Sequence, residues 1–309
     1  MGRCAFLGGA AAQISPCPVI NPRHSPKIQQ MIRPYQIVFT LFAVLCGTAS
    51  YAQQPESSAT PAPAAVAVTP PAAKQSFHIY LLMGQSNMVG RDTRGLESQV
   101  ENSRILSLNA DGQWVVARDP LHFSDGRIPP GIGPGTSFAR EMLKTDPKIT
   151  IGLVPCAVGG TPLRRWTKGK GGDLYEKAVE RARLASQTGV IEGVLWHQGE
   201  TDTTKQQNAD SYEARLTQMF QDLRQDLGLP NLPIVVGQLG EFLALSPQKY
   251  PYAETVRAAI KHMPAVVPGV GYADSAGLGD KGDKLHFSAE AQREMGVRYA
   301  KAMRDLERK

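Results

Sequence analysis

Residues 79–90 read Ile-Tyr-Leu-Leu-Met-Gly-Gln-Ser-Asn-Met-Val-Gly, and this stretch decides the fold and the chemistry that we expect. Its apolar beginning is typical of a buried strand, and Gly84 permits the tight turn that ends the strand. Ser86 therefore lies just past a strand end, where a nucleophilic serine is expected in an α/β hydrolase. The stretch differs from the Gly-x-Ser-x-Gly nucleophile elbow because Asn87 follows the serine. The partners of this serine must therefore be sought elsewhere in the chain.

The first 75 residues are predicted to lie outside the folded domain. A basic start, a short apolar run and small residues before position 53 form the pattern of a secretory signal peptide over residues 31–52. Residues 1–30 precede this signal and are expected to be a non-structural upstream extension, with Met31 as the true start. Residues 53–75 are rich in Pro and Ala without periodicity, which predicts a disordered linker.

Charge and hydropathy narrow the classes of partner. Residues 1–52 contain four of the 34 basic side chains and none of the 28 acidic ones, so the remainder has a net charge of about +2 rather than +6. Such a balance does not favour nucleic-acid binding. The apolar run of the signal is shorter than the ~20 residues of a membrane-spanning helix. We expect an exported protein, periplasmic or secreted, without a membrane span after cleavage; lipidation of Cys46 and the oligomeric state stay open.

Residues 76–309 are predicted to form one α/β domain. Short apolar runs alternate with amphipathic stretches, which predicts a parallel sheet covered on both faces by helices. Functional residues of such sheets lie beyond the carboxyl ends of the strands. The segment 91–136 is expected to form a hairpin around Asp111-Gly112 and loops over one end of the sheet. The predicted strands are 77–83, 149–154, 190–197, 234–239 and 270–273, and the predicted helices are 137–144, 174–187, 210–227, 253–263 and 288–306.

The predicted strand ends carry polar or glycine-rich blocks that together suit acyl transfer to serine. A serine hydroxyl needs a histidine to take its proton, and the histidine needs a carboxylate to orient it. Asp283 and His286 lie three residues apart and can supply both groups, and we prefer Asp283 to the more distant Asp280. The chain also provides donors for the developing oxyanion in Gly159-Gly160 and Gln198.

At these blocks the chain resembles the SGNH-hydrolase superfamily. Within it, the blocks are similar to the sialate O-acetylesterase-like branch, which includes acetylxylan esterases of carbohydrate esterase family 6, and the resemblance covers about residues 77–303. It implies a flavodoxin-like three-layer α/β/α sandwich with a five-stranded parallel sheet, no cofactor, and removal of acetyl groups from sugar hydroxyls. The blocks are Gly84-Gln-Ser-Asn-Met88, Gly159-Gly-Thr161, His197-Gln-Gly-Glu-x-Asp202 and Asp283-x-x-His286.

The resemblance also implies a role for each matching residue. Ser86 would be the nucleophile, His286 the general base and then acid, and Asp283 the partner of His286. The oxyanion donors would be the backbone N–H of Ser86, the backbone N–H of Gly160 or Gly159, and the side chain of Gln198. No metal site is expected, because the six histidines show no pair or cluster with ligand spacing.

Other residues near the blocks are candidates for supporting or substrate-binding roles. His197 lies on an apolar strand and is better explained as a core residue than as a second base. Glu200 could order loops or assist the triad, and Trp166 and Arg91 could line a sugar cleft or pack in its wall. Gln85 and Asn87 flank the serine.

The sequence leaves two questions of function open. The same chemistry could act on another acyl ester, such as a lipid or a thioester, and a non-catalytic carbohydrate-binding protein could share the scaffold. Within the acetylesterase interpretation, sialic acid, xylan and other glycans all remain candidate substrates, because specificity is expected to lie in loops such as 91–136.

Overall fold

The computed structural model describes residues 66–124, 126, 128–169 and 173–308. The predicted extension 1–30, the predicted signal peptide 31–52 and the first part of the predicted linker therefore lie outside the described residues. No helix in the described part of the chain is both long enough and apolar enough to span a membrane.

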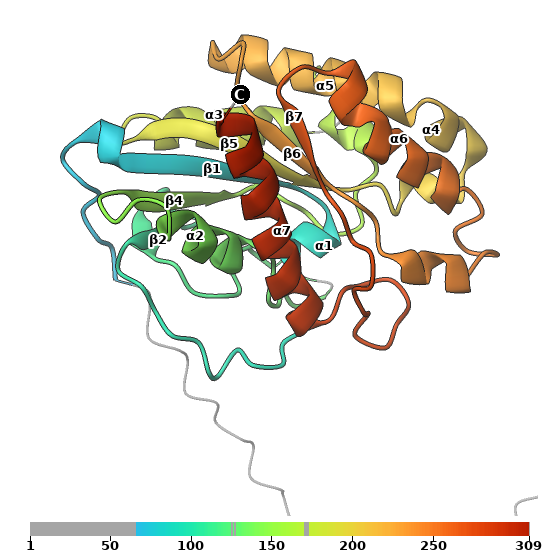
Figure 1. Ribbon diagram of the computed structural model, residues 1–309, viewed down its shortest axis with the longest axis horizontal. Helices are drawn as coiled ribbons and strands as arrows, with labels where there is room; N and C mark the ends of the chain where they lie inside the picture. Colours follow the sequence, from blue (N-terminus) through green and yellow to red (C-terminus); the bar gives the residue numbers. More distant parts are fainter. Residues whose placement is uncertain (1–65, 125, 127, 170–172, 309) are drawn as a thin grey trace, which may run out of the picture. The chain divides into compact units, whose positions relative to one another are not determined.

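A seven-stranded sheet forms the centre of the described domain (Figure 1). Its order is β3-β2-β4-β1-β5-β6-β7, and every neighbouring pair is parallel except β2 and β3. The five predicted strands are the run β4-β1-β5-β6-β7, whose order matches the flavodoxin-like arrangement. The strands are β1 (Phe77–Gly84), β2 (Ile105–Leu108), β3 (Trp114–Val116), β4 (Thr150–Pro155), β5 (Val190–His197), β6 (Ile234–Gly237) and β7 (Val270–Ala273).

The predicted hairpin around Asp111-Gly112 is present, and it extends the sheet. Its two strands, β2 and β3, pair with each other, and β2 also pairs with β4. Trp114 is buried and packs edge-to-face on Phe77 with ring centroids 4.8 Å apart. The predicted count of five strands was therefore too low, because the hairpin buries apolar side chains against the sheet edge.

Helices cover both faces of the sheet, so the three-layer prediction is confirmed. Successive side chains of β1 point to opposite faces: Leu81 joins the core beneath α3, α5 and α6, and Leu82 joins the core beneath α2 and α7. Figure 1 shows α7 crossing in front of the sheet with α2 beside it. The long helices are α2 (Gly135–Leu143), α3 (Leu174–Ala185), α5 (Tyr212–Leu227), α6 (Ala253–Val266) and α7 (Ala289–Glu307).

Short helices connect these layers at the strand ends. Two of them are α-helical turns, α1 (Ser86–Val89) and α4 (Gln206–Asp210). The 3₁₀ turns are η1 (Lys74–Ser76), η2 (Leu163–Trp166), η3 (Asp202–Thr204) and η4 (Glu241–Leu245). Of these, α1 and η3 follow the two central strands β1 and β5, so they lie where a site of this fold is expected.

The end of the predicted linker is part of the domain, which corrects the predicted boundary at residue 76. Ala67 forms an antiparallel bridge with Val115, and the N–H of Val68 bonds to the carbonyl of Trp114 at 2.8 Å. Val68 also packs against the core. Residues 66–68 read Val-Ala-Val and contain no proline, so their backbone N–H groups are free to pair with the edge of β3.

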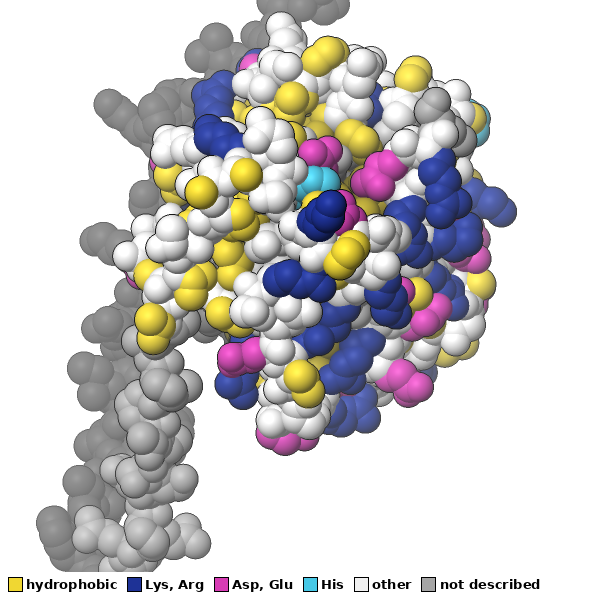
Figure 2. All heavy atoms as spheres, turned by 60° about the vertical axis from the view of Figure 1, so that its left-hand side comes forward, with side chains coloured by type: hydrophobic (Ala, Val, Ile, Leu, Met, Phe, Trp, Pro, Cys, Tyr) yellow, Lys and Arg dark blue, Asp and Glu magenta, His cyan; other side chains and the backbone are white. Residues whose placement is uncertain are grey.

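The surface of the domain carries charges of both signs. Figure 2 shows Lys and Arg side chains gathered on one side of the visible face, with Asp and Glu side chains among them. Several of the ion pairs join neighbouring turns of one helix, as between Arg298 and Glu294 or Lys301 and Asp305 on α7. This mixture is typical of a solvated helix face.

Candidate active site

Ser86 is delivered to the site by a turn that only glycine fits. Gly84 ends β1 with φ of +129°, and a Cβ there would lie 2.0 Å from the carbonyl oxygen of His197. The next residue, Gln85, donates its N–H to the same oxygen at 2.8 Å. Ser86 then begins α1, so its N–H has no partner within the helix. The serine therefore lies between β1 and β5, where the strand order reverses.

The structure brings Ser86, His286 and Asp283 into one chain of hydrogen bonds. His286 Nε2 lies 3.0 Å from Ser86 Oγ, and His286 Nδ1 lies 2.8 Å from Asp283 Oδ2. An ionised carboxylate only accepts hydrogen bonds, so Nδ1 carries the ring proton and Nε2 faces the serine with its lone pair. Asp280, the rival partner, instead accepts from the N–H groups of Gly282 and Lys284 in the same loop.

Burial and hydrogen bonding set the charges of this chain. Burial alone would raise the pKa of Asp283, but the hydrogen bonds from the ring and the backbone of His286 lower it to about 2. Burial lowers the pKa of His286, and the Asp283 carboxylate opposes that shift. At neutral pH the aspartate is therefore charged and the imidazole neutral, which is the state required to accept a proton from serine.

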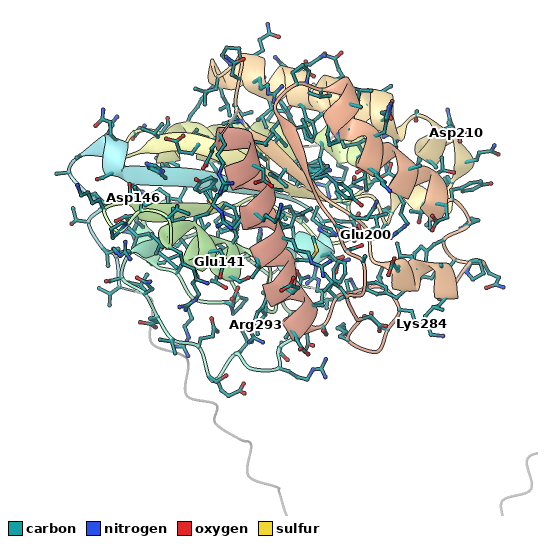
Figure 3. All side chains as sticks on the ribbon, in the orientation of Figure 1. Glu141, Asp146, Glu200, Asp210, Lys284 and Arg293 are labelled. Atoms are coloured by element: carbon teal, nitrogen blue, oxygen red, sulfur yellow. The ribbon has the colours of Figure 1, made fainter. Side chains whose placement is uncertain are left out.

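Asn87 holds the loop that carries the histidine. Its Nδ2 donates to the carbonyl of Leu285 at 3.1 Å, and its Oδ1 accepts from the N–H of Phe287 at 3.1 Å. The same Nδ2 donates to Glu200 Oε1, so the segment after β5 is tied to this loop as well. Figure 3 shows Glu200 beside α1, near the loop on which Lys284 is labelled. Asn87 is fully buried, and its predicted supporting position is structural rather than in contact with a ligand.

A cavity of about 260 Å³ opens over the serine. The predicted residues that line it are Gln85, Ser86, Arg91, Gly159, Gly160, Glu200 and His286. Five further lining residues were not singled out from the sequence: Ile128, Thr201, Thr204, Tyr250 and Leu285. A larger hollow of about 970 Å³ lies over α3, and it contains none of the residues from the four sequence blocks. The smaller cavity is therefore the candidate site.

Residues 76–305 match the model of a family described as carbohydrate esterase, sialic acid-specific acetylesterase. The chain belongs to this family. A probable carbohydrate esterase of Arabidopsis thaliana is 36% identical over 244 residues, which cover 72% of this chain and 89% of that protein. As a member of the sialic acid-specific acetylesterase family, the chain is a carboxylic ester hydrolase. The family resemblance seen in the four sequence blocks is thereby confirmed.

Solved structures agree with the observed fold. The X-ray structure of an Arabidopsis thaliana protein has a TM-score of 0.66 and 34% identity, and the match covers 74% of this chain and 98% of that one. NanS matches with a TM-score of 0.60 and 18% identity over 78% of this chain and 99% of its own. A carbohydrate acetylesterase from Xanthomonas citri has a TM-score of 0.58 and 22% identity over 74% and 56% of the two chains.

One predicted oxyanion donor of this family member needs correction. Gln198 is fully buried, and its Nε2 donates to Asp202 Oδ2 at 2.7 Å, to the Thr161 carbonyl at 3.1 Å and to Gln85 Oε1 at 3.2 Å. Its amide N–H groups are therefore occupied, and it is not among the described residues that line the cavity. Gln198 instead holds Gln85, whose Oε1 also accepts from the N–H of Thr201.

Gly159 and Gly160, by contrast, lie at the cavity as expected. Gly160 has φ of +66°, and no atom lies within 4 Å of the position that a Cβ would take. The turn after β4 is held by a hydrogen bond of 2.8 Å from the Thr161 hydroxyl to the Val158 carbonyl. The backbone N–H of Gly160 makes no hydrogen bond to any described residue, so it is available to a ligand.

Two other candidates lie in the core. Trp166 is fully buried and packs edge-to-face on Trp196 with ring centroids 5.3 Å apart, so it does not line the cavity as a sugar-binding residue would. His197 is buried, and its Nδ1 bonds to the hydroxyl of Tyr299 at 2.9 Å. Burial lowers the pKa of His197 to about 3, which agrees with the prediction of a core histidine.

Arg91 and Glu200 do line the cavity. Arg91 donates to the carbonyls of Ile128 and Pro129, so it ties the segment after α1 to the loop before α2. Burial raises the pKa of Glu200 to about 7, despite the hydrogen bond from Asn87. Glu200 is therefore a carboxyl group that changes charge near neutral pH inside the cavity wall.

Proposed function

We propose that this chain is a serine carbohydrate O-acetylesterase that acts through an acetyl-serine intermediate. The observation that carries the proposal is the chain of hydrogen bonds from Asp283 through His286 to Ser86, at a cavity where the strand order reverses. Membership of the sialic acid-specific acetylesterase family supports an acetylated sugar as the substrate.

The proposed reaction has two halves. Ser86 Oγ attacks the acetyl carbonyl while His286 Nε2 takes the hydroxyl proton, and the resulting imidazolium is stabilised by Asp283. The tetrahedral intermediate collapses when His286 gives this proton to the sugar oxygen, and the sugar leaves. A water molecule, activated by the neutral His286, then attacks the acetyl-serine carbonyl, and acetate and free Ser86 are released.

The oxyanion is proposed to bind the backbone N–H groups of Ser86 and Gly160, with Gly159 as the alternative to Gly160. We assign the third donor to Gln85 instead of Gln198. Gln85 lines the cavity, and its Oε1 is held by Gln198 and Thr201, so its amide N–H₂ is the end available to a ligand. This assignment keeps a side-chain amide in the oxyanion hole but moves it from the residue after β5 to the residue after β1.

The cavity suits a short acyl group. Its volume of about 260 Å³ is below the ~300–1,000 Å³ of pockets that enclose drug-sized ligands. A long acyl chain would leave this space, whereas an acetyl group and an adjacent ring fit within it. We therefore favour sialate-type or acetylxylan-type substrates over lipids and thioesters. From the predicted signal peptide we also propose that this activity lies in the periplasm or outside the cell.

The decisive test is Ser86→Ala, assayed with 4-nitrophenyl acetate and with a panel of acetylated sugars. We expect kcat to fall by about 10³-fold or more on both, because no other group can form the acetyl-enzyme. Ser98→Ala is the matched control, since Ser98 is exposed and outside the cavity. A fluorophosphonate probe should label the wild-type protein and Ser98→Ala, but not Ser86→Ala.

Two outcomes would contradict the proposal. Undiminished hydrolysis by folded Ser86→Ala would rule out the serine mechanism. A preference for 4-nitrophenyl esters of eight or more carbons over the acetate, by 10-fold or more in kcat/KM, would favour a lipase and rule out the acetylesterase.

A further inference from the structure

Two residues that line the cavity each contain a buried side-chain oxygen without a partner among the described residues. The hydroxyl of Tyr250 and Oε2 of Glu200 make no hydrogen bond to any described residue. Tyr250 is 5% exposed and Glu200 is 1% exposed, and both line the cavity together with Ser86 and His286. Buried polar groups are nearly always paired, so two exceptions in one small cavity require an explanation.

Hydrogen bonds hold the segments that carry both residues. The N–H of Tyr250 bonds to the Ser246 carbonyl at 3.0 Å, and the N–H of Tyr252 bonds to the Thr203 carbonyl at 3.0 Å. The second bond joins the segment before α6 to η3, which follows Glu200. Glu200 in turn accepts from Asn87 through Oε1, so only Oε2 is left unpaired. These bonds fix the two segments that carry Tyr250 and Glu200 relative to each other.

The chemistry of the two oxygens defines their ligand. A tyrosine hydroxyl both donates and accepts a hydrogen bond, and a carboxyl oxygen accepts one or, when protonated, donates one. A sugar hydroxyl can both donate and accept, whereas the methyl group of an acetate can do neither. Filling this part of the cavity with an apolar group would leave both oxygens unpaired, at a cost in binding.

We propose that Tyr250 and Glu200 form a hydroxyl-binding subsite for a free hydroxyl on the sugar ring next to the acetylated oxygen. This inference rests on the proposed esterase function. Because the cavity holds about 260 Å³ and also contains Ser86 and His286, a group bound there lies within about one ring of the scissile ester. The substrate class is therefore a sugar acetylated beside an unmodified hydroxyl, not a fully acetylated one.

Tyr250→Phe tests this subsite because it removes one oxygen and keeps the ring. The substrates are the best-cleaved sugar monoacetate of the panel, its analogue lacking the neighbouring hydroxyl, and 4-nitrophenyl acetate. We expect the wild-type enzyme to prefer the hydroxylated sugar by at least 10-fold in kcat/KM, and Tyr250→Phe to prefer it by 3-fold or less. On 4-nitrophenyl acetate Tyr250→Phe should lose less kcat/KM than on the hydroxylated sugar, because this substrate has no sugar hydroxyl to bind.

Tyr252→Phe is the matched control, since Tyr252 belongs to the same segment but does not line the cavity; it should keep the wild-type preference. Two results would overturn the subsite: no preference for the hydroxylated sugar in the wild type, or an equal loss by Tyr250→Phe on all three substrates. If the wild type cleaves 4-nitrophenyl acetate but no sugar acetate, the carbohydrate function itself fails and the subsite with it.

Discussion

His286 and His197 are both buried near the end of β1, but only His286 has the surroundings of a catalytic base. His286 joins Ser86 at 3.0 Å and Asp283 at 2.8 Å. His197 pairs with Gly84 in the sheet, but its Nδ1 bonds to the Tyr299 hydroxyl, and its Nε2 lies 3.9 Å from Glu200 without a hydrogen bond. Closeness to Ser86 alone therefore does not make a histidine a catalytic base. A base also needs a carboxylate on one nitrogen and the nucleophile on the other.

The largest difference is expected when each histidine is replaced. His286→Ala should lower kcat for acetate esters by about 10³-fold or more, because serine then loses its proton acceptor. His197→Asn should keep kcat within about 10-fold but lower the free energy of unfolding by ~1–3 kcal/mol, since a buried hydrogen bond is disturbed. Steady-state kinetics and urea unfolding separate the two effects. If His286→Ala and His197→Asn both fold and lose kcat equally, the two histidines do not differ in their roles.

The next largest effect is expected for Asp283, the carboxylate that is hydrogen-bonded to His286 and not to His197. Asp283→Asn should lower kcat by about 10²–10⁴-fold, because an amide can neither hold the correct tautomer nor stabilise the imidazolium. The pH profile should move as well. Burial already lowers the pKa of His286, so the wild-type acid limb lies below pH ~6.5, and loss of the negative charge should shift it further down.

Asp280→Asn is the control for this variant, since Asp280 lies in the same loop and its carboxylate accepts from the backbone N–H groups of Gly282 and Lys284. Asp280→Asn should leave the acid limb of the pH profile at the wild-type position. An unchanged limb in Asp283→Asn, or an equal shift in Asp280→Asn, would remove Asp283 from its proposed role.

The smallest expected effect is a change in the free energy of unfolding caused by Glu200, which lies beside His197. Burial raises the pKa of Glu200 to about 7, above its unfolded value near 4.3, so its ionisation destabilises the folded state as pH rises through this interval. Glu200→Gln cannot ionise. Relative to the wild type, it should therefore gain ~1–3 kcal/mol in unfolding free energy between pH 4.5 and 8, measured by urea unfolding. Glu180→Gln, at an exposed position, is the control and should show no such trend. If the difference in unfolding free energy between Glu200→Gln and the wild type does not change with pH, Glu200 stays charged.

Most residues at the site could be predicted from the sequence, because in this fold the site is assembled at strand ends. An apolar run followed by a polar block places Ser86, Gly160 and Glu200 beyond the carboxyl ends of β1, β4 and β5 without any knowledge of packing. The three-residue spacing likewise singled out Asp283, which contacts His286, over Asp280, which does not. These inferences need only chain order and the direction of the strands.

The remaining errors concern the direction in which a side chain points. Gln198 and Glu200 share one block, but Gln198 faces Asp202 inside the domain while Glu200 lines the cavity. Trp166 follows a turn at the cavity and still packs in the core. Tyr250 lies in a segment with no motif, and the hydrogen bond between Tyr252 and Thr203 joins that segment to η3 beside the site. Such contacts depend on tertiary structure, which local patterns do not contain.

The single turn of α1 makes the alignment of the site independent of the loops around it. Ser86 and Asn87 are consecutive residues on this turn, and the Asn87 side chain forms hydrogen bonds with the backbone on both sides of His286. A displacement of α1 should therefore move Ser86 and His286, the proposed nucleophile and base, in the same direction and change their separation little. The segments that meet the sugar can vary in length and sequence without retuning the reacting atoms, so new substrates are accessible to this scaffold at little catalytic cost.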